Sequence, residues 1–256
     1  MNFITYGGSE KKSVMLIHGM ASSAHKTYFE VVTILAESYH VILCELDGHE
    51  HEKNNDFKSV SQESSRIEEY ISKYENGSIY AVCGFSLGAS VVIDLLQRGN
   101  IKVNKTILDA ACVVDVGIAA PLITLMFMYV VDRLKKKKQV PSILMDNMFG
   151  KDNPGFAEML EPCVSLCSVR NICREVYHYK MDDRLRKYSG AIEFWCGARE
   201  QWPIRSADMI KKYLPQLKVH LFEKMGHGQY LYQYPADYAE MIKIFLSYSG
   251  EDQPYF

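Results

Sequence analysis

The sequence predicts an α/β protein built on an open, doubly wound and mostly parallel sheet. Short apolar runs alternate with longer segments of helical periodicity along most of the 256 residues, which is typical of a parallel sheet covered on both faces. Hydrophobic residues make up 48% and charged residues 23%, an ordinary globular composition that excludes disordered, collagen-like and coiled-coil chains. The length suits one large domain, or one domain with an insertion.

The first part of the chain supplies four predicted strands and three predicted helices in alternation. Strands are expected at short, continuously apolar runs, and helices where apolar residues recur at spacings of three and four. The strands are Ser13–His18, His40–Leu46, Ser78–Gly84 and Lys105–Ala110, and the helices are Thr27–Glu37, Ser59–Tyr74 and Leu87–Gln97.

The stretch 112–188 interrupts this alternation of strands and helices, which resumes after residue 188. This stretch is helical in pattern and rich in methionine, and it lies between two predicted core strands. We therefore predict a core domain of residues 1–111 and 189–256, with 112–188 as a helical cap or lid above the carboxyl ends of the strands. The later elements are the strands Ala191–Cys196 and Lys218–Phe222 and the helices Ser206–Leu214 and Tyr238–Tyr248.

One uncharged, apolar segment within that insertion, 116–131, is a candidate for a transmembrane helix. It is shorter than the ~18–20 apolar residues that span a bilayer, and Pro121 interrupts it, so we predict a buried or lid helix and no transmembrane span. The segment suits an apolar acyl pocket, and equally suits core packing or a homodimer contact. Lys135–Lys138 follow this segment. They are either a solvated helix end or a binding site for an anionic group, such as a lipid head group or a phosphate-bearing thioester.

The strongest chemical signal is the segment Gly84-Phe85-Ser86-Leu87-Gly88. An apolar run precedes it and a helical pattern follows it, which is the context of a nucleophile elbow. Both glycines are needed because a side chain at either position would collide across the sharp turn. Ser86 would then lie exposed in strained backbone at a helix N-terminus, where developing negative charge is favoured. We predict Ser86 to be a nucleophile rather than an incidental serine in a glycine-rich turn.

A serine nucleophile needs a general base, and eight histidines are candidates. His227 lies in a Gly-His-Gly triplet directly after the last predicted strand, where a flexible loop can aim its ring across the strand tips. His18 is expected to shape a loop after the first strong strand, and His49 and His51 fall in a polar turn. We therefore predict His227 as the base.

The base in turn needs a carboxylate to orient it. Glu200 closely follows a predicted strand and lies between Ser86 and His227 in the chain, which is the order expected with this elbow. Asp109 ends an earlier strand and can reach the same space. We predict Glu200 as the orienting acid, with Asp109 as the alternative.

A tetrahedral intermediate needs two N–H donors for its oxyanion. The first is expected from Leu87, directly after the nucleophile. The second is expected from Met20, because Gly19 lets the preceding loop turn so that this N–H points inward. Trp202 lies close to the predicted acid and Tyr230 close to the predicted base. Each is expected either to line the pocket or to pack within the fold.

The net charge and the cysteine content restrict the possible binding partners and the cellular location of the protein. With 29 basic and 31 acidic residues the net charge is −2, so no overall positive field favours nucleic acid as a partner. Seven cysteines cannot all pair, and the first residues lack the pattern of a secretory signal, which together predict a cytoplasmic location. Cys163, Cys167 and Cys173 do not have the paired spacing of a zinc site, so no metal and no cofactor are expected.

Five segments in this order resemble the α/β-hydrolase superfamily, of the carboxylesterase or lysophospholipase-like kind. The resemblance covers most of the chain outside 112–188 and implies an α/β-hydrolase fold and a serine hydrolase acting on a small-molecule ester or thioester. Two departures are Glu50, where the family more often has glycine, and Glu200, where it more often has aspartate. The segments are HGM at 18–20, ELDGHE at 45–50, GFSLG at 84–88, GARE at 197–200 and GHG at 226–228.

Two other functions are compatible with the same residues. The fold can serve a ligand-binding protein with little turnover, because fold does not determine function. The same triad can also serve a C–C hydrolase, a lyase or an acyl transferase, which usually carry additional charged residues in the pocket.

Overall fold

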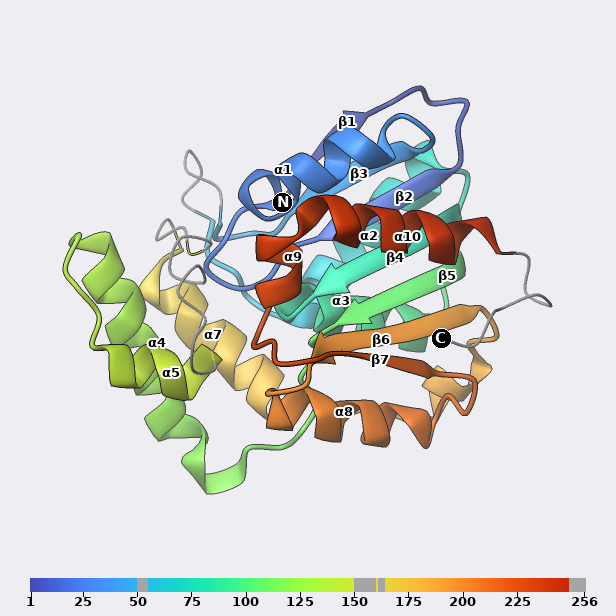
Figure 1. The fold of residues 1–256 in the computed structure, drawn as a ribbon. Helices are drawn as coiled ribbons and strands as arrows, with labels where there is room; N and C mark the ends of the chain where they lie inside the picture. The colour runs from blue at the N-terminus through green and yellow to red at the C-terminus, as the bar shows by residue number, and fades with distance from the viewer. Residues whose placement is uncertain (50–54, 150–159, 161–163, 249–256) are drawn as a thin grey trace.

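The computed structural model describes residues 1–49, 55–149, 160 and 164–248. Within them seven strands form one sheet in the order β1-β3-β2-β4-β5-β6-β7, and every neighbouring pair is parallel except β1 with β3. Helices cover both faces of the sheet (Figure 1), which confirms the predicted doubly wound, mostly parallel fold. The strands are β1 (Asn2–Tyr6), β2 (Ser13–Ile17), β3 (His40–Glu45), β4 (Ser78–Phe85), β5 (Lys102–Asp109), β6 (Ala191–Gly197) and β7 (Lys218–Phe222).

The central strands form the core because both of their faces are removed from water. All residues of β2 and β3 are buried, and so are the carboxyl halves of β4 and β5. This burial explains why the strands read as continuous apolar runs rather than alternating ones. Strand β1 differs, since it is partly exposed, pairs only with β3 at the edge of the sheet, and was not predicted from the sequence.

Helices α1 and α10 lie on one face of the sheet and α2 and α3 on the other (Figure 1). Serine side chains cap the N-termini of two of these helices. The Ser23 hydroxyl accepts from Lys26 N–H at α1, and the Ser59 hydroxyl accepts from Gln62 N–H at α2. The core helices are α1 (Ala24–Leu35), α2 (Val60–Tyr74), α3 (Leu87–Arg98), α8 (Gln201–Lys211), α9 (Gln229–Gln233) and α10 (Pro235–Ser247).

Two helices begin earlier than the sequence predicts. Helix α8 begins at Gln201 instead of Ser206, because Pro203 falls in its first turn, where the missing N–H has no intrahelical partner. For the same reason α10 begins at Pro235 instead of Tyr238.

A buried lysine anchors the end of α10 to the sheet. Lys105 on β5 is 8% exposed, and its ammonium donates to the carbonyls of Phe245, Leu246 and Tyr248 at 3.0, 2.8 and 2.6 Å. These carbonyls lie at the negative end of the helix dipole, so the buried charge is compensated.

Within the described part of the stretch 112–188, the helices α4, α5 and α7 (Ala120–Lys135, Ser142–Phe149 and Leu166–Tyr177) lie beyond the carboxyl ends of the strands (Figure 1). Of the two expectations for 116–131, a buried helix or a lid helix, the buried one fails for much of the segment: Ala120, Val130 and Val131 are buried, but Leu122 and Leu125 are exposed. Glu50 and Cys163, singled out in the sequence, lie outside the described residues. The elements of the stretch are the 3₁₀ turn η1 (Gly117–Ala119), α4 (Ala120–Lys135), α5 (Ser142–Phe149), α7 (Leu166–Tyr177) and the 3₁₀ turn η2 (Asp183–Lys187).

Candidate active site

Ser86 occupies a sharp turn between β4 and α3. Its backbone has φ +52° and ψ −110°, a conformation that a non-glycine residue rarely adopts, and its N–H donates to the Asp109 carbonyl at 2.8 Å. The turn needs the two flanking glycines. A Cβ on Gly84 would lie 2.5 Å from the carbonyl carbon of Gly88, and a Cβ on Gly88 would lie 2.2 Å from the Ile17 carbonyl oxygen. Helix α3 can therefore approach the ends of β4 and β2 only without side chains at these positions.

We expect Gly88→Ala to destabilise the fold by about 1–3 kcal/mol, because the new methyl group would meet backbone that cannot move aside. Alanine would otherwise favour the helix by up to about 1 kcal/mol. Urea unfolding measures the change. Gly77→Ala is the comparison: a new Cβ there would have no atom within 4 Å, so its expected cost is only the strain of alanine at φ +73°, about 1 kcal/mol. An unchanged or higher stability for Gly88→Ala would contradict the tight approach.

A continuous chain of hydrogen bonds joins Ser86, His227 and Glu200. His227 Nε2 lies 3.1 Å from the Ser86 hydroxyl oxygen, and His227 Nδ1 lies 2.5 Å from Glu200 Oε1. The second Glu200 oxygen accepts from Gly197 N–H at 2.7 Å, which fixes the carboxylate. Asp109, the alternative acid, instead accepts from the Tyr238 hydroxyl at 2.9 Å. The structure thus places Glu200 at the imidazole, with Asp109 buried nearby.

Backbone contacts hold the loops of Glu200 and His227 together. Ala198 N–H donates to the Phe222 carbonyl at 2.9 Å, and Arg199 N–H donates to the Met225 carbonyl at 3.1 Å. A Cβ on Gly197 would lie 2.4 Å from the Met225 carbonyl oxygen, so the end of β6 and the loop after β7 meet at backbone distance. The relative position of the acid and the base is therefore set by the main chain.

The surroundings of His227 and Asp109 shift their pKa values upward. Burial lowers the pKa of His227, but the adjacent Glu200 carboxylate outweighs burial and holds it above the ordinary value of 6.5. Burial, followed by repulsion from Glu200, raises the pKa of Asp109 to about 7. Asp109 is thus disfavoured as a permanent anion, because burial removes it from water and Glu200 repels a second negative charge.

If His227 is the general base, kcat/KM should fall as pH decreases through its pKa, since only the neutral ring accepts a proton. The raised pKa predicts a half-maximal value above pH 6.5. A pH profile with a soluble ester measures this midpoint. In Glu200→Gln the carboxylate is lost while burial remains, so the midpoint should move to lower pH. A midpoint that moves upward in the variant would contradict the pairing.

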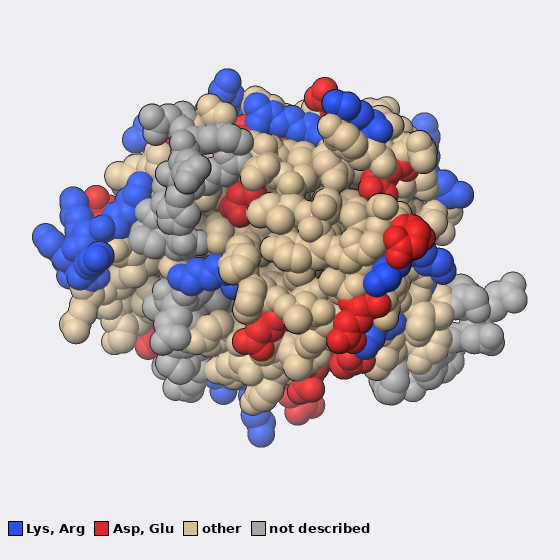
Figure 2. Space-filling model, turned by 90° about the horizontal axis from the view of Figure 1, so that it is seen from above, with Lys and Arg blue, Asp and Glu red and all other residues tan. Residues whose placement is uncertain are grey.

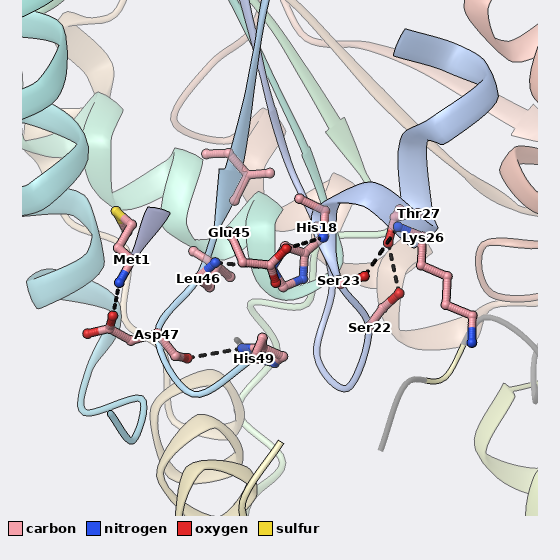
Figure 3. A network of polar contacts seen from close by, with 12 residues as sticks. Met1, His18, Ser22, Ser23, Lys26, Thr27, Glu45, Leu46, Asp47 and His49 are labelled. Carbon is pink, nitrogen blue, oxygen red and sulfur yellow. Dashed lines mark hydrogen bonds and ion pairs between the residues drawn. The ribbon is translucent and has the colours of Figure 1, made fainter. Parts of the chain in front are cut away.

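The loop after β2 is organised by two buried histidines (Figure 3). His18 Nδ1 lies 2.7 Å from the Gly19 carbonyl oxygen, so Nδ1 carries a proton, because a carbonyl only accepts. His18 Nε2 lies 3.1 Å from both Leu46 N–H and Glu45 Oε1. The Glu45 Oε2 atom in turn accepts from Ala24 N–H at 2.8 Å, which ties β3 to the start of α1.

His49 fastens the same loop from the other side. Its Nδ1 lies 3.0 Å from the Asp47 carbonyl, and its Nε2 accepts from Ala21 N–H at 3.2 Å. Burial, and then the neighbouring His18, lower the pKa of His49 to about 3, so the ring is neutral and can accept. The chain does turn at Asp47 and Gly48, as expected, and His49 N–H donates to the Leu46 carbonyl, but His49 is fully buried. No local signal reveals this residue, because its burial depends on the loops that meet over it.

The two residues predicted to supply oxyanion N–H groups, Met20 and Leu87, lie close to Ser86. The Gly19 carbonyl faces His18, and the N–H of Met20 points the opposite way in the same trans peptide. Leu87 N–H belongs to the first turn of α3, where N–H groups have no intrahelical partner. Met20, Leu87 and Ser86 all line one cavity.

That cavity has a volume of about 500 Å³, within the range of small-molecule sites. Ser86 and His227 lie in its wall together with polar Asp146 and Arg199. Trp202 also lines it, whereas Tyr230 stacks on Phe222 with 4.1 Å between the ring centroids. Most of the remaining wall is apolar, and α4 and α7 contribute Ile123, Met126, Phe127, Ile172 and Val176 to it.

No group of three or more His, Cys, Asp or Glu side chains that could hold a metal occurs in the part of the chain that the structure describes. Of the clustered cysteines, Cys167 is exposed and Cys173 is buried. Burial raises the pKa of the Cys173 thiol to about 11, so it is protonated near neutral pH.

Strand order, the turn at Ser86 and the loops that meet there define an α/β hydrolase. The family model described as "Serine aminopeptidase, S33" matches residues 8–161, and the chain belongs to this family of α/β hydrolases. No curated protein matches the chain.

Many solved structures share the fold. An α/β hydrolase family protein from Desulfitobacterium hafniense superposes with a TM-score of 0.80 at 20% identity, covering 96% of this chain and 100% of that one. A carboxylesterase from Nitrososphaera gargenis gives 0.76 at 14% identity, covering 96% and 93%. The enol-lactonase from Burkholderia xenovorans LB400 gives 0.76 at 10% identity, covering 96% of each chain.

Proposed function

We propose that this hydrolase cleaves a carboxylic ester or thioester with an apolar acyl group through an acyl-enzyme intermediate. The observation that carries the proposal is the unbroken chain Ser86–His227–Glu200 in the wall of a mostly apolar cavity. A serine becomes nucleophilic when a base accepts its proton and a third group orients that base. The carboxylesterase and enol-lactonase folds support this chemistry by analogy.

In the proposed mechanism Ser86 Oγ attacks the carbonyl carbon while His227 Nε2 accepts the hydroxyl proton. The Glu200 carboxylate stabilises the resulting imidazolium and keeps its Nδ1 proton in place. The N–H groups of Met20 and Leu87 donate to the oxyanion. His227 then returns the proton to the leaving group, and water activated by the same ring releases the acid.

The cavity supports an apolar acyl group as the substrate part that is bound. Its wall on the side of α4 and α7 offers aliphatic, methionine and aromatic side chains, which favour a hydrocarbon over a polar group. In this proposal residues 112–188 act as a cap over the core domain of 1–111 and 189–256. Asp146 and Arg199 are placed to contact polar parts of the substrate.

Initial rates on p-nitrophenyl esters of increasing acyl length test the proposal. We expect kcat/KM to rise from acetate toward medium chains and to fall when the chain outgrows the cavity. Ile123→Trp fills part of the cavity, so the optimum should move to a shorter chain. Ile244→Trp adds the same bulk at a surface position of α10 that is 42% exposed and outside the cavity, so it should leave the optimum unchanged.

Two results would overturn this function. An absence of turnover on every ester and thioester would favour a ligand-binding protein. An optimum that does not respond to Ile123→Trp would place the acyl group elsewhere.

A further inference from the structure

Helix α4 presents apolar side chains on two faces. On its inner face Ile123, Met126 and Phe127 line the cavity. On its outer face, and on the turn η1 just before it, four apolar side chains follow one another at spacings of four, three and four residues, which places them along one side of a helix. They are exposed by 102% at Ile118, 63% at Leu122, 62% at Leu125 and 44% at Tyr129.

This outer stripe is not explained by packing within the described structure. Single exposed apolar side chains are common, but a continuous row of them marks a surface that meets an apolar partner. The helical stretch Gly117–Lys135 is long and apolar enough to cross a membrane by length and composition, and only 17% of its most apolar window is buried.

Positive charge lies at the C-terminal end of the same helix. Lys135–Lys138 are all exposed, and Arg133 precedes them, while Asp132 is the one acidic residue between Ala120 and Lys138. Lys136 pairs with Asp132 at 2.8 Å, which leaves the segment strongly positive in a chain of net charge −2. Figure 2 shows Lys and Arg side chains gathered at the end of the molecule where Figure 1 places α4 and α5.

An apolar row that ends in lysines matches the interface of an anionic lipid bilayer. Such a helix lies in the plane of the interface, with apolar side chains among the acyl chains and ammonium groups at the phosphates. A spanning orientation would remove Val130 and Val131 from their buried positions and open the cavity wall. A contact between the α4 helices of two copies would cover the apolar row but would oppose the five basic residues with Asp132 alone.

We propose that the α4 surface, made of Ile118, Leu122, Leu125, Tyr129 and Lys135–Lys138, docks on anionic lipid bilayers. The opposite face of α4 lines the cavity. If Ser86 acts as in the proposed function, docking would bring it close to esters dissolved in the lipid phase. The substrate class that follows is an ester of a membrane-partitioned acyl chain.

Flotation with lipid vesicles tests the docking directly. The full chain should float with vesicles of phosphatidylcholine mixed with phosphatidylglycerol, bind far less to phosphatidylcholine alone, and lose binding as salt is added. Lys136→Gln/Lys137→Gln/Lys138→Gln should weaken binding by roughly fivefold per lysine. Leu122→Ser/Leu125→Ser should weaken it at all salt concentrations. The matched control Lys211→Gln/Lys212→Gln/Lys218→Gln removes three exposed lysines elsewhere and should bind normally.

The outcomes separate docking from catalysis. Ser86→Ala should bind vesicles as the wild type does, so failure of ester turnover with intact binding would overturn only the proposed function. Absence of binding to anionic vesicles, or binding that ignores both sets of substitutions, would overturn the docking. So would a dimer in analytical ultracentrifugation that Leu122→Ser/Leu125→Ser dissociates, because the stripe would then belong to a second copy.

Discussion

Ser86→Ala is expected to reduce kcat on a soluble ester by roughly 10⁴-fold or more, leaving the residual rate that oxyanion stabilisation and binding supply. The substitution removes the only atom at the elbow that can attack a carbonyl while leaving the N–H groups of Met20 and Leu87 in place. Initial rates at saturating ester measure the loss, and thermal unfolding checks the fold.

Ser90→Ala is the matched control for this substitution. Ser90 lies on α3 one turn after Ser86, is fully buried, and its hydroxyl has no hydrogen-bond partner within the described structure. Removing this hydroxyl should leave turnover unchanged and should not destabilise the fold. Turnover that survives Ser86→Ala would contradict the assignment of the nucleophile.

Glu200→Gln is expected to lower kcat by roughly 10³–10⁴-fold, because the amide keeps the size of the side chain but no longer stabilises the imidazolium. An amide can also donate to Nδ1 of His227, which favours the wrong tautomer for accepting a proton from Ser86. The loss should appear in kcat more than in KM, since Glu200 acts on the reaction through His227 rather than by binding the acyl chain. Rates over a range of ester concentrations separate the two constants.

Asp109→Asn provides the comparison that distinguishes the two candidate acids. Asparagine retains an oxygen that accepts from the Tyr238 hydroxyl, and Nδ1 of His227 pairs with Glu200. Its effect on kcat should therefore be much smaller than that of Glu200→Gln. The reverse ranking would assign the orienting role to Asp109.

The structure brings together Ser86 and His227, two predicted site residues that have local sequence signals. Ser86 lies between glycines that a sharp turn requires, and His227 lies in a Gly-His-Gly loop after a strand, so each has a signature within a few residues. The mostly parallel sheet, covered on both faces, also followed from the continuous apolar runs, because a doubly covered sheet leaves no polar face.

What the sequence left open depends on contacts between distant segments. Glu200 and Asp109 both follow strand ends, and only the loops around Gly197 and Met225 decide which carboxylate reaches His227. The burial of His49 arises where the loops after β2 and β3 meet. Strand β1 is short and partly exposed, so it lacks the continuous apolar run from which a strand can be predicted, and its pairing with β3 was not predicted.

The central claim is that Ser86 carries the acyl group during turnover. Intact-protein and peptide mass spectrometry after rapid quenching of the reaction with a p-nitrophenyl ester tests it most directly. We predict one added acyl group per chain, located on the peptide that contains Ser86 and absent from Ser86→Ala. Sustained turnover with the acyl group on another residue, such as exposed Cys167, or with no acylated species in a pre-steady-state burst, would contradict the account.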